Sequence, residues 1–261
     1  MKSVASRADI LKAIGITRWQ RRGDFAPDDI AQIAATAEPV VADAPEVLAD
    51  PEHIALPETE TTAEVSAEAL SGSGHWAVLR QQVSACKDCG LHERRTQAVL
   101  GSGDTAASWM LVGEAPGEEE DASGEAFVGK AGHLLDEMLL AVGLNRADVY
   151  IANTVKCRPP NDDDPTAEQV SACAQYLDRQ IELLKPDFIL ALGKTAAMRL
   201  AGLKPSASLT SVRGKVLHYG DAGIPVVVTY HPAYYLRSPR EKRKGWDDLV
   251  FARNVVSGNQ S

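Results

Sequence analysis

The sequence contains no long apolar run. None of its apolar stretches approaches the roughly 18 to 20 consecutive residues that a transmembrane helix needs. The first residues, MKSVASRADILKAIG, lack the continuous apolar centre of a secretory signal peptide. We therefore expect a cytoplasmic protein that makes no contact with a membrane.

Basic residues are missing from one long segment. Residues 24–70 contain 12 Asp or Glu and no Lys or Arg, whereas the net charge of the whole chain is only -9. Because this segment alone carries a charge of -12, the other segments together have a net charge of +3 and can still present a basic face. The acidic composition therefore does not exclude a nucleic-acid partner.

Residues 24–75 also lack a sustained helical or strand period, and they are rich in Ala, Glu, Pro, Thr and Val. Such a segment has too few large apolar side chains to offset the entropy lost on ordering. We predict three parts: a candidate docking peptide at 1–23, a disordered acidic linker at 24–75, and a folded domain at 76–261.

Short apolar runs alternate with helix-period stretches in the folded part. The runs lie at 108–113, 148–155, 187–193 and 224–232, and the helix-period stretches lie between them at 129–143, 166–184 and 194–202. This alternation predicts an α/β domain built from right-handed βαβ units. We expect a mostly parallel four-stranded sheet with helices on both faces.

Residues of unusual chemistry follow each predicted strand. The four strands end in GEAPG, NTVKCRPP, GKTA and HPAYY. Ligands of parallel α/β sheets bind outside the carboxyl ends of the strands. The sequence therefore predicts one ligand-binding site at the edge of the sheet where these strands end.

Cysteine is scarce, and its spacing is informative. Cys86 and Cys89 form a C-x-x-C pair, and 67 residues separate this pair from Cys157, with Cys173 15 residues further on. Two disulfides would use all four thiols, but a metal site is the better interpretation for a cytoplasmic chain. Spacing alone leaves zinc and a four-iron cluster open.

Three further features at the predicted edge each have a structural alternative. His231 is either a structural hydrogen-bonding residue or a functional one. Asn153 interrupts an apolar strand, so its amide either caps its own backbone or pairs with a ligand. A basic run follows HPAYY and suits DNA phosphates, although such runs are usually solvated helix starts; its candidate residues are Arg237, Arg240, Lys242 and Arg243.

The ordered set GEAPGEEED, AFVGKAG, NTVKCRPP and HPAYYL, together with the four cysteines, resembles the family 4 uracil-DNA glycosylases. The resemblance covers residues 76–254. It implies a three-layer α/β/α fold and a 4Fe-4S cluster held by Cys86, Cys89, Cys157 and Cys173. It also implies excision of flipped-out uracil from DNA by a monofunctional hydrolase, which we expect to be a monomer.

The resemblance assigns roles to residues of these motifs. The amides of Glu114 and Ala115, with Gly117 in the same turn, would hold the base, and Phe127 would stack on it. Asn153 would pair with the uracil edge, and His231 would donate a hydrogen bond to uracil O2 as negative charge develops there.

The water-positioning group is less directly assigned, because Ala115 stands where sister families have an aspartate. Glu120 is the first candidate and Glu118 the second. Glu120 is alternatively placed near uracil C5, where a thymine methyl group would collide. No basic insertion occurs between Cys157 and Cys173, so we expect no covalent DNA adduct.

Two competing functions remain at this point. One is a non-catalytic iron–sulfur module that binds DNA in association with the replication machinery, and the other is a zinc-stabilised nucleotide hydrolase. Residues 6–23 resemble the amino-terminal peptide of the psi subunit of the bacterial clamp loader, chiefly in LKAIGITRWQRR. This resemblance implies docking to the replicative clamp loader, with an unstructured start of the chain as the alternative.

Overall fold

The computed structural model describes residues 72–258. The candidate docking peptide and nearly all of the predicted linker lie outside these residues. The predicted start of the folded domain at residue 76 falls inside the first described helix, which begins at Gly72. The folded part thus includes the last residues of the segment predicted as linker.

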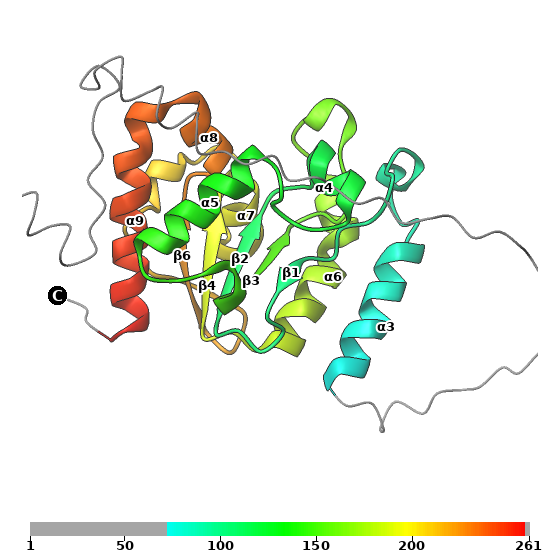
Figure 1. The fold of residues 1–261 in the computed structure, drawn as a ribbon, viewed down its shortest axis with the longest axis horizontal. Helices are drawn as coiled ribbons and strands as arrows, with labels where there is room; N and C mark the ends of the chain where they lie inside the picture. The colour runs from blue at the N-terminus through cyan, green and yellow to red at the C-terminus, as the bar shows by residue number, and fades with distance from the viewer. Residues whose placement is uncertain (1–71, 259–261) are drawn as a thin grey trace, which may run out of the picture. The chain divides into compact units, whose positions relative to one another are not determined.

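A six-stranded sheet forms the centre of the fold, in the order β1-β3-β2-β4-β6-β5 (Figure 1). Its four central strands are parallel, and the short strands at the two edges are antiparallel to their neighbours. The predicted four-stranded sheet is this parallel centre, and the two edge strands extend it. The strands are β1 (Ser102–Gly103), β2 (Trp109–Gly113), β3 (Val149–Asn153), β4 (Phe188–Leu192), β5 (Leu217–Tyr219) and β6 (Ile224–Thr229).

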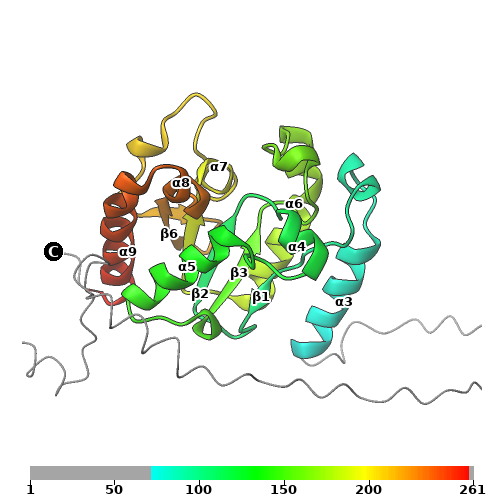
Figure 2. The same cartoon turned by 45° about the horizontal axis from the view of Figure 1, so that its top comes forward.

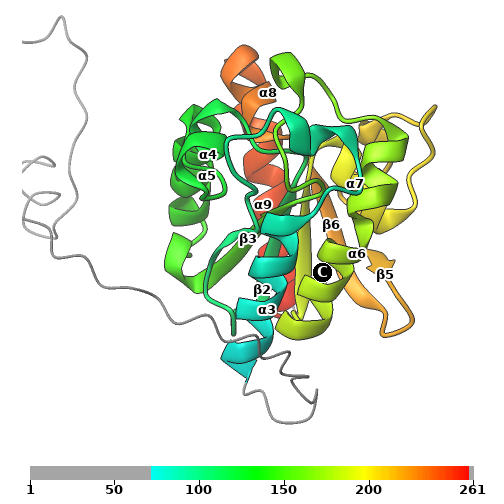
Figure 3. The same cartoon turned by 90° about the vertical axis from the view of Figure 1, so that its right-hand side faces the viewer.

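Helices cover both faces of the sheet, and Figure 3 shows α5 and α6 on opposite sides of it. The longer helices are α3 (Gly72–Ala85), α5 (Lys130–Ala141), α6 (Ala167–Leu184), α7 (Lys194–Ala201) and α9 (Lys242–Val256). Two six-residue helices, α4 (Glu118–Ser123) and α8 (Pro232–Arg237), follow β2 and β6. The three-layer α/β/α prediction is confirmed.

Strand alternation explains why both faces are covered. Successive side chains of a strand point to opposite faces. In β2, Met110 and Val112 pack in the cluster that includes residues of α6 and α7, whereas Trp109 and Leu111 pack in the cluster that includes residues of α5 and α9. Because β2 is buried on both faces, its sequence is a continuous apolar run. On the outer side of α6, α3 adds a smaller apolar cluster.

The carboxyl ends of the parallel strands meet at one edge, around which α4, α7 and α8 lie (Figure 2). The chain passes from β2 to β3 on one side and then crosses to β4 on the other. Such a switch in strand order opens a crevice at the carboxyl edge. Within residues 72–258, no helix is both long enough and apolar enough to span a bilayer.

Candidate active site

A cavity of about 310 Å³ opens at this edge of the sheet. Its walls come from the segments that follow β2, β3 and β6 and from the start of α5. Eight of the residues singled out from the sequence line it: Glu114, Ala115, Gly117, Glu120, Phe127, Asn153, His231 and Arg237.

Other candidates lie outside the cavity wall. Glu118 is exposed on α4, and its carboxylate lies 3.6 Å from Arg158. Three predicted DNA-binding residues are exposed beyond α8 and do not belong to the cavity wall; they are Arg240, Lys242 and Arg243. The structure thus separates the residues that line the cavity from basic residues on the surface near it.

Phe127 and His231 form an aromatic wall of the cavity. Their ring centroids are 5.4 Å apart, with an angle of 34° between the ring planes. The ring of Phe127 also lies close to the backbone at Gly113: a Cβ atom there would be 2.5 Å from both Phe127 Cζ and Asn153 Oδ1. Glycine is therefore needed at the end of β2 so that both side chains can approach the strand.

Asn153 is the last residue of β3 and is only 1% exposed. Its Oδ1 is buried and has no hydrogen-bond partner among the described residues. An unpaired buried oxygen costs free energy, and in a cavity wall it is a site for a ligand donor. The alternative in which the Asn153 amide oxygen caps its own backbone does not occur.

His231 precedes α8 and accepts a hydrogen bond at Nδ1 from the Ala233 N–H, at 3.2 Å. Burial lowers the pKa of His231 to about 4, with a further contribution from Arg237. The imidazole is therefore neutral near pH 7. Because Nδ1 accepts a hydrogen bond, the single proton is on Nε2, which makes that atom a donor.

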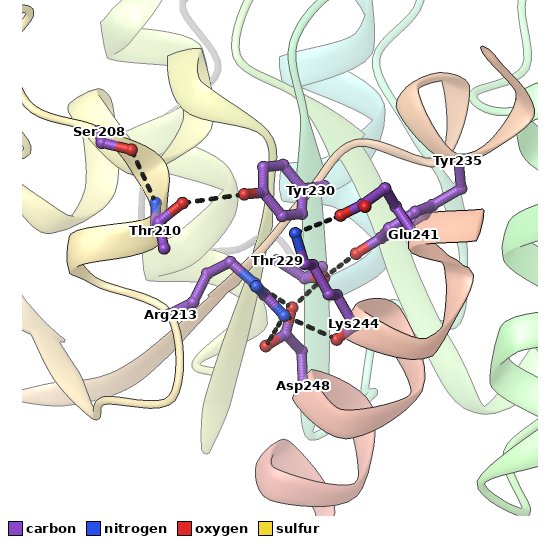
Figure 4. A network of polar contacts seen from close by, with 9 residues as sticks. All are labelled: Ser208, Thr210, Arg213, Thr229, Tyr230, Tyr235, Glu241, Lys244 and Asp248. Atoms are coloured by element: carbon purple, nitrogen blue, oxygen red, sulfur yellow. Dashed lines mark hydrogen bonds and ion pairs between the residues drawn. The ribbon is translucent and has the colours of Figure 1, made fainter. Parts of the chain in front are cut away.

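The turn that carries His231 is anchored by a buried polar network (Figure 4). Thr229 Oγ1 donates to Asp248 Oδ2 at 2.7 Å and lies 2.9 Å from the Tyr235 hydroxyl. Asp248 also accepts two hydrogen bonds from Arg213, at 2.8 and 2.9 Å. These contacts join β6, α8, α9 and the segment before β5, so the backbone on both sides of His231 is fixed.

Glu120 is buried, and both of its carboxylate oxygens accept hydrogen bonds. Oε2 accepts from the Gly117 N–H at 3.0 Å, which caps α4. Oε1 accepts from the N–H groups of Val128 and Gly129, each at 2.9 Å. Glu120 therefore connects the GEAPG turn to the AFVGKAG turn, and this arrangement suits a structural brace better than a water-positioning group.

Glu114 has the electrostatic character expected of a reactive carboxyl group. Burial, together with a hydrogen bond to Asp164, raises the pKa of Glu114 to about 7. The Thr195 hydroxyl donates to Glu114 Oε2 at 2.9 Å and opposes this rise. A carboxyl group that titrates near pH 7 in a cavity is a common feature of catalytic sites.

Sequence reasoning missed the acidic side of the cavity. Asp162, Asp163 and Asp164 line it, on the loop between β3 and α6. Arg158 holds this loop through Asp162, with Nε–Oδ1 and Nη2–Oδ2 distances of 2.7 and 3.2 Å. The signal for this acidic side is a run of three aspartates shortly after a predicted strand.

The four cysteines come together at a second, much smaller cavity of about 10 Å³. All four thiols are free of disulfides, and all four residues line this cavity. In the described part of the chain, however, no three His, Cys, Asp or Glu side chains converge as ligands of one metal ion.

Hydrogen-bond donors are directed at two of these sulfur atoms. Arg95 Nη1 lies 3.0 Å from Cys157 Sγ, and the Lys156 backbone N–H lies 3.3 Å from Cys173 Sγ. Donors around sulfur favour thiolates and are typical of the surroundings of iron–sulfur clusters. The donor set therefore fits a thiolate-bound metal group.

Comparison with known proteins shows which family this chain resembles. Residues 100–250 match the family model of the uracil DNA glycosylase superfamily. The chain is 46% identical to the type-4 uracil-DNA glycosylase of Thermotoga maritima over 69% of this chain and 93% of that protein. It is 44% identical to the type-4 uracil-DNA glycosylase of Archaeoglobus fulgidus over 65% of this chain and 87% of that protein.

Similarity to another branch is lower. The chain is 32% identical to the type-5 uracil-DNA glycosylase of Pyrobaculum aerophilum, over 50% of this chain and 63% of that protein. The type-4 relatives, by contrast, are matched at more than 40% identity over most of their length. The chain therefore belongs to the uracil-DNA glycosylase superfamily and, within it, to the type-4 uracil-DNA glycosylases.

Proposed function

We propose that the 310 Å³ cavity receives a uracil base flipped out of DNA and that the chain hydrolyses its N-glycosidic bond, leaving an abasic site. One observation carries this proposal: the buried, unpartnered Oδ1 of Asn153 lies in a cavity wall beside the Phe127 ring. An amide next to an aromatic ring is suited to read the edge of a base that stacks on the ring.

Asn153 supplies the base selectivity in this proposal. Uracil presents an N–H at N3 between two carbonyl groups, so Asn153 Oδ1 can accept from N3 while the amide nitrogen donates to a carbonyl oxygen. Cytosine has no proton on N3 and carries an amino group in place of the neighbouring carbonyl. A buried acceptor facing the lone pair of N3 would remain unpaired, which disfavours cytosine.

His231 stabilises the leaving group. As the bond between sugar and base breaks, negative charge develops on uracil and spreads to O2. The Nε2–H of the neutral imidazole donates to this oxygen, and the donor gains strength as the charge grows. Because the anchored turn holds the ring in place before reaction, little reorganisation is needed in the transition state.

Glu114, rather than Glu120, is the group we propose for water positioning and for stabilising the positively charged sugar. Both oxygens of Glu120 already accept backbone N–H groups. Glu114 lines the cavity and has a pKa of about 7. Its ionised form places a negative charge where an oxocarbenium-like sugar benefits from one.

The cysteines would hold a 4Fe-4S cluster; they are Cys86, Cys89, Cys157 and Cys173. Support comes from their position around one cavity and from the donors at two of the sulfurs. When bound, such a cluster supplies a covalent connection between the segment before β2, the end of β3 and α6, and it takes no part in bond breaking.

DNA would be held by four exposed basic residues, of which Arg237 borders the cavity and the others lie beyond it: Arg240, Lys242 and Arg243. Phosphate contacts of this kind give binding that weakens steeply with salt concentration. The chain would act as a monomer in the cytoplasm.

Docking to the clamp loader through residues 6–23 stays a prediction, because these residues lie outside the described part of the chain. Replacing Trp19 with Ala is expected to abolish binding to the purified clamp loader and to leave excision from oligonucleotides unchanged. Equal binding by the variant and the unaltered chain would contradict the docking hypothesis.

The first experiment combines two measurements on one anaerobically purified sample. A single-turnover assay on a uracil-containing oligonucleotide should show formation of abasic sites, and the absorbance spectrum should show a broad band near roughly 400 nm. A spectrum with this band but without base release would instead favour the non-catalytic DNA-binding module.

A further inference from the structure

Phe127 has an unusual backbone conformation for an aromatic residue. Its φ is +55°, in the left-handed region that bulky side chains rarely adopt. Residues in this region persist only where their surroundings fix them. The ring that lines the cavity therefore depends on contacts made by its own main chain, outside the cavity.

Side chains of opposite charge bind the main-chain N–H groups and the main-chain carbonyl groups of this turn. The N–H groups that follow Phe127, those of Val128 and Gly129, donate to the Glu120 carboxylate. The carbonyl groups of Ala126 and Phe127 accept from the guanidinium of Arg146, with an Arg146 Nη1 to Phe127 O distance of 3.1 Å. An anion thus holds the donors of the turn, and a cation holds its acceptors.

Arg146 is itself fixed in orientation. It lies in the short 3-10 helix Arg146–Asp148, directly before β3. Its Nη1 forms an ion pair with Asp136 Oδ1 of α5 at 3.1 Å, and its Nη2 donates to Ser102 Oγ of β1 at 3.1 Å. Arg146 does not line the base cavity, and its contact to the cavity wall runs through the main chain of the turn that carries Phe127.

Close packing against α5 restricts the backbone conformation of the turn at Phe127. A Cβ atom on the buried Gly132 would lie 1.8 Å from the Phe127 carbonyl oxygen, so the first turn of α5 passes directly against this oxygen. The Phe127 carbonyl oxygen is therefore packed against the α5 backbone at Gly132, and it accepts a hydrogen bond from Arg146 in that position.

We propose that Arg146 is a positioning residue for uracil excision: its guanidinium holds the left-handed turn at Phe127 and thereby sets the plane on which the flipped base stacks. Lysine cannot replace it, because one ammonium group lacks the planar fork that reaches two carbonyl groups and a carboxylate together. This inference rests on the proposed stacking role of Phe127.

A double-mutant cycle on the full chain tests the proposal. The variants are Arg146→Met, Phe127→Ala and their combination, assayed by single-turnover excision from a uracil-containing oligonucleotide. We expect Arg146→Met to lower the maximal rate about tenfold, since small displacements of a bound reactant cost large factors in rate. In the Phe127→Ala background the same substitution should lower the rate less than twofold.

Two matched variants separate positioning from folding. Arg146→Lys keeps the charge and should still lose several-fold in rate, whereas Arg179→Met removes an exposed arginine paired with Glu182 and should lose nothing. Thermal unfolding of each variant shows whether it is folded at the assay temperature. If Arg146→Met does not fold, the cycle is completed with Arg146→Lys.

The outcomes test the positioning role of Arg146 and the stacking role of Phe127 separately. An equal rate loss from the Arg146 substitution in both backgrounds, or full activity of Arg146→Lys, would overturn the positioning role. An unchanged rate for Phe127→Ala would instead overturn the stacking role on which the inference rests. If the Arg146 substitution lowers the rate in the unaltered chain but not in the Phe127→Ala background, the positioning role and the stacking role are both supported.

Discussion

The two cavities of the domain are built in different ways. The base cavity is large and is lined by both polar and apolar side chains, and most of them come from the segments that follow the parallel strands β2, β3 and β6. The cysteine cavity is about 10 Å³ and is bordered by α6 and by the segment between α3 and β1. One is open to a ligand of the size of a base, whereas the other is closed around sulfur atoms.

This difference indicates how the two sites contribute to the enzyme. In the base cavity, the His231 turn and the Glu120 carboxylate are held by hydrogen bonds that already exist in the folded chain. In the cysteine cavity, Arg95 and the Lys156 backbone N–H donate to two of the four sulfur atoms, Cys157 Sγ and Cys173 Sγ. The first site should therefore tolerate loss of its ligand, whereas the second should depend on its metal group for stability.

The largest expected effect comes from the base cavity. His231→Ala removes the donor to uracil O2 and should lower the single-turnover rate by about 10²- to 10³-fold, as loss of one oxyanion donor does in other enzymes. Bound iron per chain should not change, since His231 does not line the cysteine cavity. His231→Asn, which keeps an amide donor and an acceptor for the Ala233 N–H, should lose less; equal rates for the two variants would contradict the donor role.

The next effect comes from the cysteine cavity and should be mainly on stability. Cys173→Ser should lower bound iron per chain, measured by metal analysis, and weaken the absorbance band near 400 nm. A loss of about 3 kcal/mol of metal-binding free energy should lower Tm by roughly 10 °C in a domain of this size. A variant with unchanged Tm and iron content would show that Cys173 is not a ligand.

Lys156 connects the two cavities, and its removal should affect both moderately. Lys156 is only 1% exposed. Its backbone N–H donates to Cys173 Sγ at 3.3 Å. Its Nζ donates to the Asn153 carbonyl oxygen at 2.7 Å and to the Gln180 side chain. Lys156→Met leaves these two acceptors unpaired, which should cost about 1–3 kcal/mol of unfolding free energy in denaturant titrations. If the excision rate falls along with stability, Asn153 is positioned partly by Lys156 of the cysteine cavity. If the excision rate is unchanged, the base cavity does not depend on this contact.

The sequence predicted the elements with strong periodic patterns. The four parallel strands and the helices α5, α6 and α7 were placed within a few residues, because each has an apolar run or helical period between clear breakers. The edge strands were missed because β1 has two residues and β5 three, too short for alternation to be visible. Helix α3 was assigned partly to the linker, since its apolar residues are few; they pack against α6, and Trp76 also contacts Tyr150 of β3.

The site was predictable to the extent that its residues occur in contiguous motifs. Strand ends meet in a parallel sheet, so Asn153 and His231 could be placed together from the sequence. The sequence pointed to Glu120 and then Glu118 for water positioning rather than to Glu114, because the partners of each carboxylate are not visible in the motif: Glu120 faces backbone N–H groups, whereas Glu114 faces the Thr195 hydroxyl. Arg146 was missed for the same reason: its partners are main-chain carbonyl groups, which leave no signal in the sequence.

The smallest expected effect is a shift in pH dependence at the Glu114–Asp164 pair. Asp164 helps to raise the pKa of Glu114 to about 7, so the excision rate should rise with pH through this value as Glu114 ionises. Asp164→Asn removes the neighbouring charge, which should move the midpoint to lower pH, toward the usual Glu value of 4.5.

Stability gives an independent check on this pair. A raised carboxyl pKa in the folded state contributes stability below the unfolded value of 4.5, and this contribution is lost as pH rises through about 7. Asp164→Asn should therefore raise Tm relative to the unaltered chain at pH 8 more than at pH 4. Since His231, with a pKa of about 4, is neutral near pH 7, a rate profile whose midpoint near pH 7 does not move in Asp164→Asn would mean that a group other than Glu114 titrates during excision.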